Sequence, residues 1–170
     1  MGHVRIMSRN LNFTVSLARP DDAPDLTRIA HAAKSYWGYP DEWMAAWHVQ
    51  LTVDPQDIVA DPTFVACADD RIVGFCAVSQ RGDIASLEHL WVLPDAMGCG
   101  VGRALFDQAA LHARRSGATL VEVEADPHAV DFYRHLGCQP FGETVYELDG
   151  QPRRLPLLRL SLPQGPVDRS

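Results

Sequence analysis

Short apolar stretches and helix-spaced apolar stripes divide the chain into a mixture of strands and helices. Strand-like stretches fall at 14–18, 63–68, 72–80, 86–93, 119–125, 143–148 and 154–162. Helical spacing falls at 41–51, 101–115 and 128–136, and in a first helix with the stripe Leu26, Ile29, Ala30 and Ala33. The turns at 69–71 and 149–150 join two pairs of strands as hairpins. The pattern therefore predicts an α/β sandwich with a mixed sheet.

No long linker, internal repeat or low-complexity stretch interrupts this pattern, so we expect one domain over 13–162. Residues 1–12 are interpreted as a loose lead-in and 163–170 as a flexible tail. With 46% hydrophobic and 22% charged residues, the 170-residue chain has the composition of a soluble globular protein. The lead-in lacks the apolar run of a signal peptide, and no window reaches the roughly 18 apolar residues of a membrane span. We expect a cytoplasmic protein without a membrane partner.

The net charge of −7 argues against nucleic acid as a partner, because such binders need basic residues to displace counterions from phosphates. It fits a cationic or neutral small partner better. The four cysteines form no C-x-x-C pair and have no histidine at zinc spacing. We therefore expect reduced thiols and no metal site.

The most informative stretch is the glycine series that follows the strand at 86–93. Gly98, Gly100 and Gly102 recur at every second position as a helix begins. Glycine permits positive φ and close approach, and the first amides of a helix have no internal partner, so the arrangement suits a phosphate or pyrophosphate. Arg103 and Ala104 stand where a Walker loop needs Lys and Ser or Thr, and the spacing is not that of a dinucleotide fingerprint. The motif therefore gives little support to a nucleotide-binding protein. The simplest alternative is a glycine-rich turn that binds no ligand.

The surroundings of this loop resemble a known family. Glu88-His89-Leu90-Trp91-Val92-Leu93-Pro94, followed by Gly98-x-Gly100-x-Gly102 and a helix, resembles motif A of the GCN5-related N-acetyltransferases (GNAT). The stretch 126–138 resembles the family's next motif, and the two occur in the family's order and at its separation. The resemblance spans 14–162. It implies a single-domain α/β fold with a mixed, mostly antiparallel sheet of about seven strands and helices on both faces.

The resemblance also implies a donor, acetyl-CoA or a similar acyl-CoA, whose pyrophosphate the loop amides hold. The donor-binding residues it predicts are Trp91, Val92, Met97, Gly98, Cys99, Gly100, Val101, Gly102, Arg103, Asp126 and His128. The pantetheine arm would lie between Trp91 and Val92 on one side and Ala125 on the other.

Two positions depart from the family pattern. Met97 replaces the usual Gln or Arg, which removes a side-chain contact to the phosphates. Asp126 replaces a common Asn; it retains an acceptor for a pantetheine amide but adds negative charge near a polyanion. We expect Cys99 to face solvent.

Acyl transfer to an amine needs a neutral nucleophile, and a positioned carboxylate or histidine can take its proton. Glu88 is the candidate base, at a position where many relatives place a catalytic Glu. Strand alternation predicts that His89 points to the opposite face of the sheet from Glu88. Glu122 and Glu124 on the neighbouring strand are further candidates. Tyr133 matches the family tyrosine that protonates or positions the leaving thiolate.

Aromatic residues crowd the segment after the first helix. These residues form either a hydrophobic lid or a wall of the acceptor pocket, where ring faces could hold an ammonium. They are Tyr36, Trp37, Tyr39, Trp43 and Trp47.

The sequence thus predicts an acetyl-CoA-dependent N-acetyltransferase for a primary amine, most simply a small molecule. The alternatives are a protein N-terminal or lysine acetyltransferase and a catalytically silent acyl-CoA-binding module. Family members often form homodimers, so the resemblance allows a homodimer here, but the sequence identifies no interface.

Overall fold

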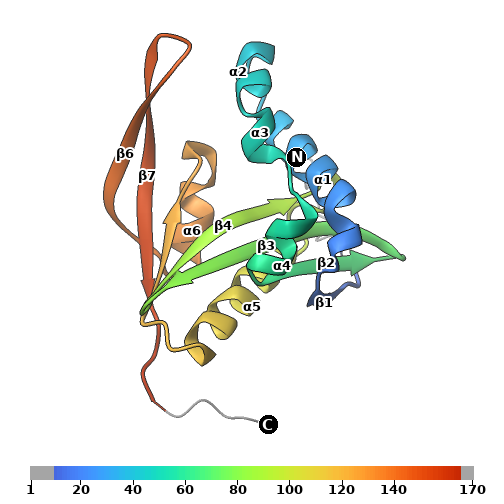
Figure 1. Cartoon of the computed structure of the whole chain (residues 1–170), viewed down its shortest axis with the longest axis vertical. Coiled ribbons are helices and arrows are strands. Elements are labelled where there is room, and N and C mark those ends of the chain that lie inside the picture. Colours follow the sequence, from blue (N-terminus) through green and yellow to red (C-terminus); the bar gives the residue numbers. More distant parts are fainter. Residues whose placement is uncertain (1–9, 166–170) are drawn as a thin grey trace, which may run out of the picture.

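The computed structural model describes residues 10–165, and a seven-stranded mixed sheet runs through the molecule (Figure 1). Its strands are β1 (Thr14–Leu17), β2 (Thr63–Ala68), β3 (Arg71–Arg81), β4 (Ile84–Val92), β5 (Leu120–Glu124), β6 (Gln139–Leu148) and β7 (Gln151–Ser161). Their order is β1-β2-β3-β4-β5-β7-β6. Among the described strands, only the β4–β5 pair is parallel. The predicted mixed, mostly antiparallel α/β sheet is confirmed.

The helices lie on both faces of this sheet (Figure 1). They are α1 (Ala23–Ser35), α2 (Asp41–Ala46), α3 (His48–Leu51), α4 (Pro55–Ala60), α5 (Val101–Arg115) and α6 (Val130–His135). Single 3₁₀ turns occur at Pro20–Asp22, Pro94–Ala96 and Pro127–Ala129. On β3, Gly74 faces α5, because an added Cβ would lie 3.1 Å from Val101 and 3.2 Å from Leu105. The neighbouring residues of β3 face α1 on the other side.

The predicted apolar stripes hold these helices against the sheet. Leu26, Ile29 and Ala30 of α1 are completely buried, and so is Leu105 of α5. The α5 bounds are those predicted, and Gly117 follows the helix with a positive φ of 91°. The helix predicted over 41–51 is instead two short ones, interrupted at Trp47.

The two predicted hairpin turns adopt left-handed backbone. Asp69 and Asp70 have φ of 50° and 61°, and Asp149 and Gly150 have φ of 52° and 74°. The long β6–β7 hairpin stands at one end of the sheet beside α6 (Figure 1). Of the predicted lead-in and tail, residues 1–9 and 166–170 lie outside the described residues.

No helix in the described part of the chain combines the length and apolar character needed to cross a membrane. Within residues 10–165, no group of three or more metal-ligating side chains comes together.

Candidate active site

The two parallel strands at the centre of the sheet part halfway along, and a cavity opens between them. β4 and β5 pair from Ile84↔Leu120 to Leu87↔Val123 and no further. Beyond that point His89 to Val92 remain paired with β3 only. A cavity of about 410 Å³ lies at the parting, bordered by β4, the glycine loop, the start of α5 and the segment after β5. We call it the donor cavity.

A β-bulge marks the parting. Ala77 pairs with His89 and Val78 with Leu87, which leaves Glu88 as the extra residue. The bulge shifts the alternation of side chains, so Glu88 and His89 border the same two cavities. The prediction that His89 points away from Glu88 is therefore wrong, because strict alternation does not hold across a bulge. Glu88 is exposed and accepts a hydrogen bond from Ser79 Oγ at 2.6 Å.

The environment of His89 fixes its protonation state. Burial lowers its pKa, against the opposing effect of Glu88 and Asp57, so the imidazole is neutral near pH 7. Trp91 Nε1 lies 3.1 Å from His89 Nδ1, and an indole can only donate. Nδ1 is thus the acceptor and Nε2 carries the proton. In this tautomer Nε2 cannot accept a proton from an amine.

The glycines of the loop serve two different purposes. Gly98 and Gly100 have φ of 76° and 84°, and no atom lies within 4 Å of a Cβ added to either. Gly102 has an ordinary helical backbone, but an added Cβ would lie 3.1 Å from Phe132 Cζ. The first two glycines therefore shape an open loop, and the third lets α6 pack closely against α5.

The start of α5 presents unpaired backbone amides to the donor cavity. Gly100 caps the helix without a side-chain hydrogen bond, and the first turn carries no acidic residue. The amides of Val101, Gly102 and Arg103 therefore have no intrahelical partner. The exposed Arg103 side chain forms no hydrogen bond or ion pair with another described residue. A helix N-terminus with a nearby guanidinium is a favourable place for a phosphate group.

The cavity gathers most of the predicted donor residues. Its border includes Trp91, Val92, Met97, Gly98, Gly100, Val101, Gly102, Arg103, Asp126 and His128. Cys99 is the exception. It does not border the cavity, and it is half-buried with Sγ 3.7 Å from the Met97 carbonyl, so its side chain does not face solvent fully as predicted. Ala125 is also buried, and its neighbours Glu124 and Asp126 border the cavity instead.

Tyr133 reaches the donor cavity from α6. The residue is 7% exposed, and its hydroxyl has no hydrogen-bond partner among the described residues. Burial is the main cause that raises the pKa of its phenol, so the group is neutral and available to donate. Of the other candidate bases, Glu124 borders the cavity and Glu122 does not.

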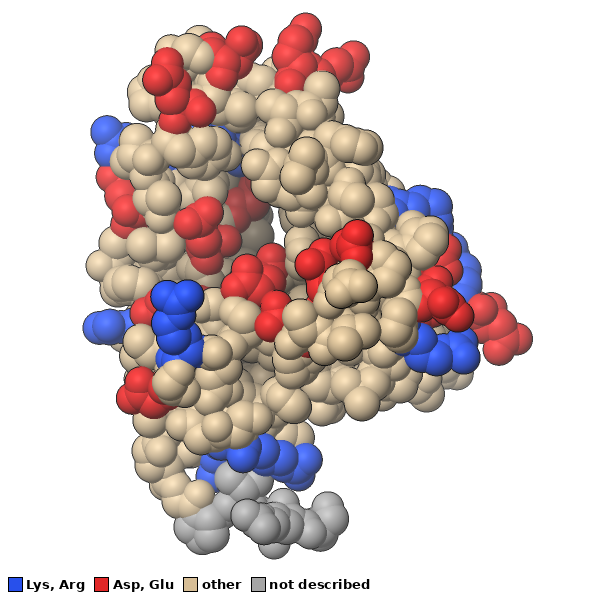
Figure 2. Space-filling view, viewed as in Figure 1, with Lys and Arg blue, Asp and Glu red and all other residues tan. Residues whose placement is uncertain are grey.

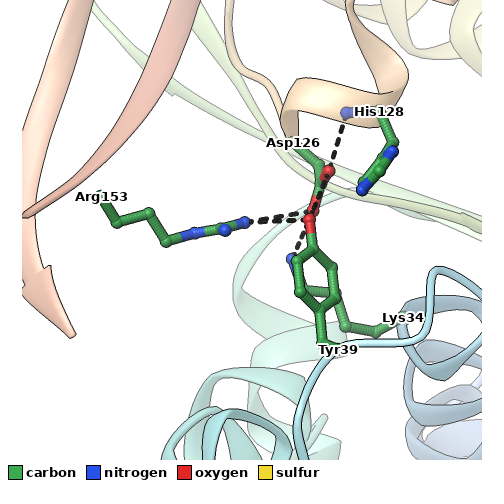
Figure 3. A network of polar contacts seen from close by, with 5 residues as sticks. All are labelled: Lys34, Tyr39, Asp126, His128 and Arg153. Carbon is green, nitrogen blue, oxygen red and sulfur yellow. Dashed lines mark hydrogen bonds and ion pairs between the residues drawn. The ribbon is translucent and has the colours of Figure 1, made fainter. Parts of the chain in front are cut away.

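Asp126 follows β5 and is fully engaged by protein donors (Figure 3). Its Oδ2 lies 2.6 Å from Lys34 Nζ and 3.4 Å from Arg153 Nη2. The Tyr39 hydroxyl lies 2.9 Å from both carboxylate oxygens, and the His128 amide donates to Oδ1 at 2.9 Å. Burial opposes ionisation, but these donors and charges outweigh it and lower the pKa of Asp126. The carboxylate therefore has no lone pair to spare for a pantetheine amide, contrary to the prediction.

Lys34 and Arg153 also correct the predicted electrostatic effect of Asp126. Two cations face one carboxylate, so this group of three side chains carries a net positive charge and not the added negative charge that was predicted. Lys34 is the single lysine of the chain and is 9% exposed. Sequence reasoning missed both residues. The sequence does contain a sign of Lys34. It lies four residues after Ala30 and therefore on the apolar face of the first helix.

The aromatic segment divides into two parts. Trp37 borders the donor cavity and stacks on His128 at 4.8 Å between ring centroids. Tyr39, Trp43 and Trp47 instead surround the protein's own cations. Lys34 Nζ lies 4.2 Å from the Trp47 ring centroid and Arg153 Cζ 5.0 Å from that of Tyr39.

The predicted acceptor wall is therefore not found at these three rings, because Lys34 and Arg153 take the place expected for an acceptor ammonium. None of the three borders the donor cavity. Tyr36 is 57% exposed and packs edge-on against Trp37.

Comparison with known proteins adds independent information. A family model described as an acetyltransferase (GNAT) domain matches residues 60–139. An uncharacterized N-acetyltransferase of Methanocaldococcus jannaschii is 25% identical over 138 residues, which cover 74% of this chain and 60% of that protein. The chain thus spans less than two thirds of the length of that relative.

In two further matches, a larger share of the other protein's length is covered. The peptidyl-lysine N-acetyltransferase YjaB of Salmonella typhimurium is 31% identical over 114 residues, 64% of this chain and 73% of YjaB. The crystal structure of the PaiA N-acetyltransferase from Thermoplasma acidophilum in complex with coenzyme A matches with a TM-score of 0.72. That match has 16% identity and covers 89% of this chain and 99% of the other.

Proposed function

Because the chain belongs to the GCN5-related N-acetyltransferase family, we propose that it moves an acetyl group from acetyl-CoA directly to a primary amine of a small molecule. One observation carries the proposal. The unpaired amides of α5, the Glu88 carboxylate and the Tyr133 hydroxyl all border one cavity between the parted strands β4 and β5. An anion site, a proton acceptor and a proton donor are thus within one space.

The donor, which is a substrate rather than a resident cofactor, fits the residues present. The amides of Val101, Gly102 and Arg103 and the Arg103 guanidinium would hold the pyrophosphate. Gly98 and Gly100 leave open space where side chains would stand. Met97 adds no charge to this site, so backbone amides carry more of the binding than in relatives with Gln or Arg there. The unpaired edge of β4 faces the parting, where an extended arm with amide groups can pair with it.

The reaction joins nitrogen to carbon and releases sulfur. The neutral amine attacks the thioester carbonyl, the N–C bond forms, the C–S bond breaks, and coenzyme A leaves as the thiolate. The nitrogen loses its second proton to solvent, which leaves a neutral amide. An alkylammonium with a pKa of about 10 loses its proton near pH 7 at a cost of about 4 kcal/mol. Glu88 takes this proton. The bulge places its carboxylate at the donor cavity, and the hydrogen bond from Ser79 orients it.

Tyr133 stabilises the departing thiolate as a hydrogen-bond donor. A thiol has a pKa of about 8.5, whereas burial raises the pKa of this phenol above its usual range. Complete proton transfer from the phenol to the thiolate is therefore uphill. The hydroxyl retains its proton and donates a charge-assisted hydrogen bond, and the thiolate gains its proton later from solvent.

A steady-state assay of coenzyme A thiol release, with mass spectrometry of the amine product, tests this proposal. We expect acetyl-CoA-dependent release that requires an amine and that falls in both Glu88→Gln and Tyr133→Phe. Release that does not depend on an amine, or the absence of turnover across primary amines despite donor binding, would contradict it. The latter result would favour an acyl-CoA-binding module.

A second candidate acceptor is a protein lysine. The similarity to YjaB, which is named a peptidyl-lysine N-acetyltransferase, favours it. The same assay distinguishes the two acceptors. It compares kcat/KM for a lysine-containing peptide with kcat/KM for a small primary amine, with acetyl-CoA as the donor in both cases. A higher kcat/KM for the peptide would replace the small molecule in the proposal.

A further inference from the structure

A second cavity adjoins the donor cavity at the β-bulge. It has a volume of about 250 Å³ and lies between the segment containing α3 and α4 and strands β3 and β4. Glu88 and His89 border both cavities. An amine that attacks the thioester must reach Glu88 from outside the space that the donor occupies. If the proposed function is correct, this second cavity gives the acceptor a route to Glu88. We call it the acceptor cavity.

Among the described residues, the border of the acceptor cavity has three carboxylates and no Lys or Arg. Asp57 lies in the first turn of α4, Asp61 directly follows the helix, and Glu88 borders the same cavity from β4. Acidic side chains gather near α4 around the hollow of the molecule, as Figure 2 shows for this face. A cationic ligand is attracted to such a site, and an anionic one is repelled.

Asp61 is the carboxylate without a partner. Ser79 donates to Glu88, and the Asp54 amide donates to Asp57 at 2.9 Å. The Asp61 side chain has no hydrogen bond or ion pair with another described residue. Burial, then repulsion from Glu88 and Asp57, raises the pKa of Asp61. A bound cation would relieve this repulsion.

The rest of the border is part apolar and part polar. Val49, Val53, Phe75 and Ala77 supply apolar surface, and the polar side chains are Gln50, Thr52, Thr63 and His89. Methylene groups can pack against the apolar side chains, whereas a carboxylate on the ligand would be repelled by the three acidic ones. The cavity therefore combines some apolar surface with negative charge at more than one point.

We propose that the acceptor is an aliphatic diamine or polyamine, one amine of which is acetylated beside Glu88 while a second ammonium binds Asp61 and Asp57. The inference rests on the proposed function and specifies its substrate class. The acetylated product retains only the second ammonium, so it is less strongly attracted to the cavity than the substrate.

A comparison of matched amines tests the inference. We would measure kcat/KM for 1,4-diaminobutane and for n-butylamine at saturating acetyl-CoA, for the wild type and for Asp61→Asn. Asn retains the shape of the side chain and removes its charge. Glu147→Gln, an exposed carboxylate on β6 outside both cavities, is the matched control. Thermal unfolding of each variant verifies that it is folded.

We expect the wild type to prefer the diamine by at least about tenfold in kcat/KM, equivalent to about 1.4 kcal/mol. Asp61→Asn should reduce this ratio about tenfold, and the control should not. High salt should also reduce the ratio, because the discrimination is electrostatic. Equal kcat/KM for the two amines, or the same ratio in Asp61→Asn as in the wild type, would overturn the inference while amine acetylation stands. Failure to acetylate any amine would overturn the proposed function as well.

Discussion

At the scale of single residues, one extra residue in β4 decides which groups meet the substrate. The bulge brings the Glu88 carboxylate and the His89 imidazole to the same two cavities. The hydrogen bond from Trp91 leaves His89 with a proton on Nε2, whereas Glu88 needs no tautomeric change to accept one. The sequence favoured Glu88 as the base and placed His89 on the opposite face of the sheet. It could not show that the two side chains lie together, because a bulge leaves no mark in the hydrophobic alternation.

Glu88→Gln should lower kcat/KM at pH 7 by a factor of about 10² to 10⁴, the usual contribution of a general base. The deficit should narrow as the pH approaches the amine pKa of about 10, because more of the amine is then already neutral. Thiol release measured at pH 7 and pH 9 checks both statements. A larger loss in His89→Gln than in Glu88→Gln would assign the base to His89 instead.

Tyr133→Phe should lower kcat while leaving the protein folded. A hydrogen bond to a charged group contributes about 1.5–3 kcal/mol, which corresponds to a loss of about 10- to 150-fold. Stability should change little, since the hydroxyl has no partner among the described residues. Steady-state kinetics measures kcat of the variant, and a urea titration measures its stability. A kcat within threefold of the wild type would remove Tyr133 from the mechanism.

At the scale of elements, the predictions succeeded where one local signal dominates. The stripe and terminal glycine of α5 determine its bounds, and the two hairpin turns contain residues that tolerate positive φ. Helix α4 was missed although Asp54 and Asp57 form a capping box, because six residues are too few to display a stripe. The helix predicted over 41–51 breaks at Trp47, a residue buried in the core, and the apolar spacing of the segment gives no sign of this break.

The two kinds of loop glycine should respond differently to substitution by alanine. Gly98→Ala should cost roughly 1–2 kcal/mol of unfolding free energy from left-handed strain alone, as the site is open. Gly102→Ala should cost a comparable amount through its contact with Phe132, and Phe132→Leu should relieve it. Urea unfolding of the single and double variants should give a coupling of at least about 0.5 kcal/mol between positions 102 and 132. Additive effects would show that Gly102 is not required for the packing of α6.

At the scale of the whole molecule, a buried ionic network joins segments that are distant in sequence. Asp126, after β5, binds Lys34 of α1, Tyr39 before α2 and Arg153 of β7 (Figure 3). The side chains of Lys34, Asp126 and Arg153 are each only about a tenth exposed. No sequence pattern connects positions this far apart, so the family resemblance identified Asp126 as a departure but could not reveal what compensates it.

Asp126→Asn should destabilise the fold by about 3–5 kcal/mol, because it leaves two buried cations without their counter-charge. The lowered pKa of Asp126 means that its stabilisation is complete above the unfolded-state pKa of about 3.9 and is lost as the pH falls through the folded-state pKa. The unfolding free energy of Asp126→Asn should therefore fall less steeply than that of the wild type between pH 5 and pH 3. Urea unfolding across this range, with Glu147→Gln as control, makes the comparison. Parallel slopes for wild type and Asp126→Asn would contradict the role assigned to the network.

The most direct test of the central claim is thermal unfolding of the wild type with acetyl-CoA, coenzyme A, NADH and ATP in parallel. A ligand that binds only the native state at about 100 times its Kd adds about 2.7 kcal/mol to the unfolding free energy. We predict such stabilisation by acetyl-CoA and coenzyme A and none by NADH or ATP. A folded protein that neither coenzyme A species stabilises would show that the cavity between β4 and β5 is not a donor site, and the acetyltransferase account would be wrong.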